Sequence, residues 1–131
     1  MMIKRNNILK IAIDSPAAAG AGTLAKNISK HYNLFYLDTG KIYRFIAYLK
    51  IKYPKKFNFK FIKEKIRSLK IQDLLNKSLL TEEVGSEASA IAKIKKIRIM
   101  VHSFQLKFAY NPPKKYNGSC LDGRDITYNI V

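Results

Sequence analysis

Residues 8–33 contain a strand pattern, a loop of small residues and a helix pattern, and this order restricts the fold more than any other feature. The run Ile8–Asp14 is rich in isoleucine and stops at Ser15, which predicts a buried strand that runs into a loop. Apolar residues then recur at helical spacing over 22–32, so we expect a helix that ends at Asn33. A strand, a loop and a helix in this order favour an α/β fold built on a parallel sheet.

The same alternation continues along the chain, whose 131 residues suit one domain. Thr81 is the expected N-cap of a helix, because two glutamates follow it at the positive end of the helix dipole. Strands that alternate with helices indicate a parallel sheet covered by helices, and such folds bind ligands at the carboxyl ends of the strands. The patterns predict further strands at 34–37 and 119–121, and helices at 41–50, 61–69, 73–75, 82–94 and 95–109.

The charge balance is strongly basic, with 25 Lys and Arg against 9 Asp and Glu and a net charge of +16. Such a charge points to a nucleic-acid or other anionic partner. Lysine, isoleucine and asparagine are all abundant, however, as an AT-rich coding bias would produce without any function behind it. Because 47% of the residues are apolar, the chain can bury a core. We therefore expect a folded domain with no specific nucleic-acid partner.

The cysteine count and the hydropathy of the chain indicate its cellular compartment. Cys120 is the only cysteine, which excludes an internal disulfide and a zinc site made of cysteines. No apolar stretch approaches the roughly 20 residues of a membrane span. Met1–Lys10 lacks the apolar core and the cleavage site of a secretion signal. These features predict a cytoplasmic chain without a membrane partner.

The loop after the first predicted strand has the position and the small residues of a phosphate-binding loop. In the pattern Gly-x-x-x-x-Gly-Lys-[Ser/Thr], backbone N–H groups wrap the phosphates, the lysine reaches the outer phosphates and the hydroxyl holds Mg²⁺. Here Ser15 stands at the first glycine and Ala21 at the lysine. An ordinary turn of small residues is the alternative for this loop by itself. The candidate ATP-binding residues are Ser15, Pro16, Ala17, Ala18, Ala19, Gly20, Ala21, Gly22 and Thr23.

Two polar blocks follow the other predicted strands. Leu37–Arg44 places Thr39, Tyr43 and Arg44 at a strand-to-helix junction. There a hydroxyl, a phenol and a guanidinium can reach one small polar ligand. Asp122–Asp125 follows the last strand and offers a carboxylate next to a guanidinium. Taken alone, either block is also compatible with a capped helix or a surface turn whose charges satisfy one another.

Together the three blocks resemble the bacterial cytidylate kinase family, nucleoside monophosphate kinases that phosphorylate CMP and dCMP. The family's Ile-Asp-Gly-Pro-Ala-x-x-Gly-Lys-Gly-Thr is similar to residues 13–23, and Leu-Asp-[Ser/Thr]-Gly-x-x-Tyr-Arg matches residues 37–44. The resemblance continues through Thr81–Val84 and closes on Asp122–Asp125, so it covers nearly the whole chain. Adenylate and shikimate kinases lack the second and third blocks, which makes the resemblance specific.

The resemblance implies a P-loop fold that binds ATP with Mg²⁺ and takes CMP or dCMP as the acceptor. Residues 15–23 would receive the ATP phosphates, with the Thr23 hydroxyl on Mg²⁺. Arg44 and Arg98 would hold the CMP phosphate, while other residues would read the cytosine or its neighbourhood, namely Ser89, Arg124 and Asp125. The positions that match the CMP site of the family are Thr39, Tyr43, Arg44, Ser89, Arg98, Arg124 and Asp125.

By the same resemblance, residues 1–58 form the core with the phosphate-binding loop, 59–94 form a helical CMP-binding subdomain, and 95–131 return to the core. In the family, the closing strands and an arginine-rich lid lie beyond the Asp-Gly-Arg-Asp block. This chain ends at Val131, so we expect a C-terminally truncated fold without them. A monomer is expected from the family, although an uncovered sheet edge permits association.

Two classes of function stay open because the loop lysine and the lid are absent. The first is a kinase that transfers the γ-phosphate of ATP to CMP or dCMP. The second is a non-catalytic or degenerate nucleotide-binding homologue that keeps the CMP site.

Overall fold

The chain divides into two compact units, one assembled from both ends of the sequence and one from its middle. A computed structural model describes residues 8–14 and 21–123. The first unit consists of the described residues up to Thr39 together with those from Gln105 onward, and the second unit is Gly40–Phe104. The second unit is therefore an insertion between the two sequence segments of the first.

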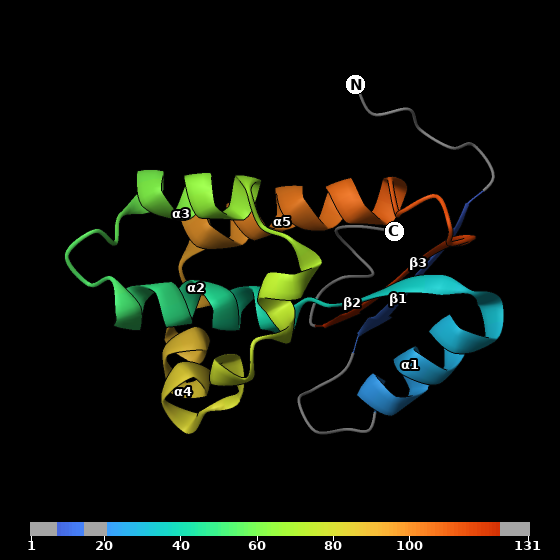
Figure 1. The fold of residues 1–131 in the computed structure, drawn as a ribbon, viewed down its shortest axis with the longest axis horizontal. Helices are drawn as coiled ribbons and strands as arrows, with labels where there is room; N and C mark the ends of the chain where they lie inside the picture. The colour runs from blue at the N-terminus through green and yellow to red at the C-terminus, as the bar shows by residue number, and fades with distance from the viewer. Residues whose placement is uncertain (1–7, 15–20, 124–131) are drawn as a thin grey trace. The chain divides into compact units, whose positions relative to one another are not determined.

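The first unit is built on a three-stranded parallel sheet (Figure 1). Its strands are β1 (Leu9–Asp14), β2 (Leu34–Asp38) and β3 (Gly118–Gly123), and β3 lies between the other two. Helix α1 (Ala21–Tyr32) packs against the sheet. The prediction of an α/β fold with a parallel sheet flanked by helices is confirmed, and each predicted strand is present.

The carboxyl ends of the three strands meet at one edge of the sheet. Asp14 pairs with Gly123, and Asp38 pairs with Asp122, both in parallel register. Each of the three polar blocks in the sequence begins at, or directly follows, one of these strand ends. The strand ends that lead into the three candidate blocks therefore lie side by side at one edge of the sheet.

The core of the first unit lies between α1 and the sheet. Ala25, Leu34 and Cys120 are buried there, one from each of three elements, and burial raises the pKa of the Cys120 thiol. At the start of β3, a Cβ on Gly118 would lie 1.9 Å from the Leu9 carbonyl oxygen. This close approach of β1 leaves room only for glycine.

The connection from α1 to β2 turns through Asn33. Its φ is 54°, in the left-handed region that asparagine tolerates better than most residues. The Asn33 side-chain amide donates to the Lys115 carbonyl at 3.0 Å, and the Asn117 N–H donates to the Asn33 carbonyl at 2.8 Å. The helix ends where the sequence predicted, and Asn33 also ties this connection to the segment before β3.

The second unit is helical, and side-chain caps begin two of its α-helices, α3 and α4. The Asn58 side chain accepts a hydrogen bond from the Phe61 N–H at 2.8 Å, and the Thr81 hydroxyl oxygen accepts one from the Val84 N–H at 3.3 Å. The prediction of an N-cap at Thr81 is confirmed. The elements are α2 (Gly40–Lys52), α3 (Phe59–Arg67), the 3₁₀ helices η1 (Ile71–Leu75) and η2 (Lys77–Leu80), α4 (Glu82–Ile91) and the part of α5 (Lys95–Tyr110) up to Phe104.

Helix α4 ends at Ile91 rather than near Ile94, where the sequence predicted its end. The Ile94 N–H bonds to the Ile91 carbonyl at 3.0 Å, three residues back instead of four, so the chain tightens into a turn before Lys95. The apolar pattern continues across this turn, and periodicity therefore did not reveal it.

Aliphatic side chains form the core of the helical unit. Ile42 and Ile46 of α2, Ile62 of α3 and Leu79 of η2 are at most 1% exposed. Helix α2 packs against α4, and an ion pair between Lys50 and Glu87 links the two helices. Over the stretches 8–14 and 21–123, no helix combines the length and hydrophobicity needed to cross a membrane.

Candidate nucleotide-binding site

Thr39 and Asp122 join the second and third polar blocks at the sheet edge. The Thr39 N–H and the Thr39 hydroxyl both donate to the Asp122 carbonyl oxygen, at 2.9 and 2.8 Å. Thr39 is only 3% exposed, so its hydroxyl faces the backbone of β3. Thr39 therefore links the residue after β2 to the end of β3. Its place in a CMP site stays a prediction.

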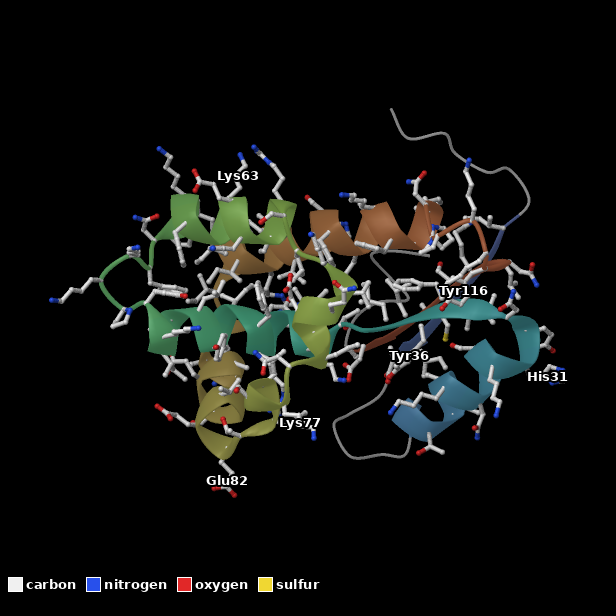
Figure 2. The ribbon with its side chains drawn as sticks, in the orientation of Figure 1. His31, Tyr36, Lys63, Lys77, Glu82 and Tyr116 are labelled. Atoms are coloured by element: carbon white, nitrogen blue, oxygen red, sulfur yellow. The ribbon has the colours of Figure 1, made fainter. Side chains whose placement is uncertain are left out.

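Tyr36 of β2, which Figure 2 labels, gives Asp122 a second partner. The phenol O–H donates to Asp122 Oδ2 at 3.0 Å. Burial raises the pKa of Tyr36, and the nearby carboxylates of Asp38 and Asp122 raise it further, because a phenolate there would be desolvated and repelled. The phenol therefore stays protonated and keeps this hydrogen bond well above neutral pH. Sequence reasoning missed Tyr36, since the contact depends on β2 and β3 lying side by side.

The substitution Thr39→Val tests how much the hydroxyl contributes to the sheet edge. Valine keeps the shape of threonine but removes one hydrogen bond to the half-buried Asp122 carbonyl, so we expect the free energy of unfolding to fall by about 1–2 kcal/mol. Urea denaturation followed by circular dichroism measures the change. Thr39→Ser keeps the hydroxyl and is the matched control, with a smaller loss. Equal stability of the valine variant and the wild type would contradict this role.

Tyr43 and Arg98 are two candidates for the CMP site that belong to the helical unit. Tyr43 lies on α2 and Arg98 on α5. Burial raises the pKa of Tyr43, while the positive charge of Arg98 acts on it in the opposite direction. The charge of one candidate therefore acts on the other, although the two come from distant parts of the chain.

Arg44, the residue after Tyr43, is anchored by the backbone of η2. Its Nη1 donates to the Leu79 carbonyl oxygen at 2.8 Å. A guanidinium has five N–H donors in a planar fork, so one hydrogen bond fixes the group and leaves others for a phosphate. Sequence reasoning chose Arg44 but not Leu79, because the partner is a backbone carbonyl and has no sequence signature.

Ser89 is an exposed residue of α4. Its hydroxyl donates to the Gly85 carbonyl at 3.2 Å, one helical turn back. Its predicted part in reading cytosine stays a prediction. Arg124 and Asp125, the other two residues predicted for that role, lie outside the described residues.

The predicted ATP side begins at α1. Residues 15–20 lie outside the described residues, and for Ala21 and Gly22 the structure describes the helix backbone alone. Thr23 is exposed in the first turn of α1, which contains no acidic residue. A helix N-terminus of this kind suits the negative charge of a phosphate.

The described residues allow a test of whether the protein itself offers ligands for the predicted Mg²⁺. Within 8–14 and 21–123, no three His, Cys, Asp or Glu residues come together as a metal site. Mg²⁺ commonly takes oxygen ligands from nucleotide phosphates and water, with few from the protein. The exposed Thr23 hydroxyl fits that mode of binding, in which the metal arrives with ATP.

The parallel sheet, its strand-end blocks and the inserted helical unit define an α/β protein of the P-loop nucleotide kinase class. Residues 11–131 match the sequence profile of the cytidylate kinase family, and the chain belongs to this family. The resemblance found in the sequence is thereby confirmed.

Three curated relatives, each named cytidylate kinase, show how far the match extends. The protein of Bradyrhizobium sp. (strain ORS 278) is 39% identical over 122 residues, which span 88% of this chain and 53% of that protein. The protein of Acidiphilium cryptum (strain JF-5) is 43% identical over 117 residues, with the same two coverages. The protein of Rhodospirillum rubrum is 38% identical over 117 residues, which span 88% of this chain and 55% of that protein. The chain therefore spans about half the length of the curated relatives it matches.

Proposed function

We propose that this chain transfers the γ-phosphate of ATP to CMP or dCMP, giving ADP and CDP or dCDP. Family membership and the name shared by the relatives support the proposal. The structural observation that carries it is the Arg44 guanidinium, which the Leu79 carbonyl holds at 2.8 Å. Two guanidinium groups are the chemistry that a monophosphate requires. The proposal, following the resemblance to the family, has the chain act in the cytoplasm as a monomer.

In the proposed reaction, an oxygen of the CMP phosphate attacks the γ-phosphorus of ATP, and the bond from that phosphorus to the bridging oxygen of ADP breaks. The protein holds the two nucleotides in line and neutralises charge on the transferred group. Arg44 and Arg98 hold the CMP phosphate, and backbone N–H groups at the start of α1 hold the ATP phosphates. When Mg²⁺ enters with ATP, the Thr23 hydroxyl would help to hold it, and the ion would supply further positive charge. The cytosine is recognised by Ser89, Arg124 and Asp125.

A second candidate is a protein that binds CMP without catalysis, and the alanine at position 21 favours it. Loss of one preorganised charge contact to a transition state costs on the order of 10²–10³ in rate. Lys26, further along the same helix than Ala21, has its ammonium 6.0 Å from the centroid of the Tyr36 ring.

Two measurements on the full chain separate these candidates. Calorimetric titration with CMP tests binding, with AMP as the control ligand that shares the phosphate but not the base. A coupled assay of CMP-dependent ADP release tests catalysis, for the wild type and for Ala21→Lys. Heat on titration together with ADP release supports the kinase. Heat without ADP release from either chain supports the second candidate, and no heat at millimolar CMP contradicts both.

A further inference from the structure

The Arg44 guanidinium lies where α2, η2 and α4 meet, and two backbone features of its neighbours define its place. One is the hydrogen bond from Nη1 to the Leu79 carbonyl. The other is Gly85 of α4, where a Cβ would lie 3.0 Å from Nη2 and 3.2 Å from Nη1 of Arg44. The guanidinium thus rests against α4 at the one position of that helix that has no side chain.

The Leu79 carbonyl is well suited to anchor the guanidinium. Leu79 is next to last in η2, and carbonyl groups at the end of a helix lack partners within it. The Leu79 side chain is completely buried, so its backbone is fixed in the core of the unit. One of the five N–H donors of Arg44 is therefore held by a rigid acceptor. The orientation of the guanidinium plane then depends on the groups that lie next to the guanidinium.

Gly85 is an unfavourable residue for the interior of a helix, since alanine has the higher helix propensity. Its φ is not in the left-handed region, so the backbone itself does not require glycine. The nearest atoms to a Cβ at this position are all from the Arg44 guanidinium, the far end of a flexible side chain. An added methyl group would therefore displace the guanidinium rather than the helix.

We propose that Gly85 is a positioning residue, which sets the orientation of the Arg44 guanidinium toward the phosphate of a bound nucleoside monophosphate. The inference rests on the proposed function for the identity of the ligand. The placement of the guanidinium itself rests only on the contacts with Leu79 and Gly85. The two parts can therefore be measured separately.

Gly85→Ala in the full chain tests the proposal through three readouts. We expect the Arg44 Nε–Hε resonance, identified by its loss in Arg44→Lys, to shift in the ¹⁵N spectrum of the free protein. We expect the Kd for CMP to rise about tenfold, as one charge-assisted hydrogen bond is weakened. The melting temperature should stay the same or rise, because alanine favours the helix. Ser86→Ala, at the adjacent exposed position of α4, is the control and should change neither the resonance nor the Kd.

A double-mutant cycle shows whether Gly85 acts through Arg44. In the Arg44→Lys background, Gly85→Ala should change the Kd for CMP by less than about twofold. The same tenfold loss in both backgrounds would overturn the proposal, as would an unchanged resonance or an unchanged Kd in the single variant. If the wild type binds no CMP, the proposed function fails and the phosphate assignment fails with it, while the resonance still reports whether Gly85 places the guanidinium.

Discussion

Arg44→Ala is expected to weaken CMP binding by about 100-fold while the chain stays folded. A guanidinium that donates to a phosphate makes charge-assisted hydrogen bonds, and their removal costs on the order of 2–3 kcal/mol of binding free energy. The substitution also removes the bond to the Leu79 carbonyl, so a loss of about 1 kcal/mol in unfolding free energy is expected with it. Calorimetric titration with CMP measures the first effect, and urea denaturation measures the second.

Lys63→Ala is the matched control for net charge. Lys63 is an exposed residue of α3 and points away from that helix into solvent (Figure 2). Its removal takes away the same single charge without touching Arg44, so we expect the affinity for CMP to change by less than about twofold. Equal losses in the two variants would mean that the basic surface as a whole attracts the nucleotide, and the assignment to Arg44 would then be wrong.

Leu121→Ala should lower the free energy of unfolding by about 3 kcal/mol, in the usual range for a buried leucine. Leu121 is completely buried in β3, where it pairs in register with Ala12 of β1 and Leu37 of β2. The cavity would therefore open in the middle of the sheet, next to both neighbouring strands. Urea denaturation of the full chain gives the change.

Leu9→Ala makes the same chemical change at the exposed start of β1. Leu9 is 43% exposed, so its truncation removes less buried surface and should cost below about 1 kcal/mol. Similar losses for the two variants would contradict the central position of Leu121 in the core.

The sequence predicted the local structure of this chain well because local signals mark most of its elements. The isoleucine run before Ser15, the asparagine at the end of α1 and the cap at Thr81 all depend on residues within a few positions of each other. Two details were not predicted, and each has a physical reason. The 3₁₀ helix η2 is too short to show a period, and the turn after Ile91 lies inside a continuous apolar pattern.

The contacts that build the candidate site were not predictable in the same way. The strand order β1-β3-β2 and its register decide that Asp122 meets Thr39 and Tyr36, and no local pattern encodes a pairing between such distant segments. The Arg44 guanidinium is held by the Leu79 carbonyl and lies against Gly85, which has no side chain. Neither a backbone carbonyl nor the space beside a glycine can be recognised in a sequence motif. The sequence therefore identified candidate ligand-binding residues, while the residues that hold them in place required the structure.

The central position of β3 has a consequence for how the protein is made. Strands β1 and β2 hydrogen-bond to β3 and not to each other, and β3 begins only at Gly118. During synthesis, both outer strands and the entire helical unit emerge before the strand that joins them. Pairing between segments so far apart in sequence is slow to form, and unpaired strand edges are prone to association in the interval. The helical unit can fold while the chain is still growing, whereas the sheet edge with Thr39 and Asp122 is completed last.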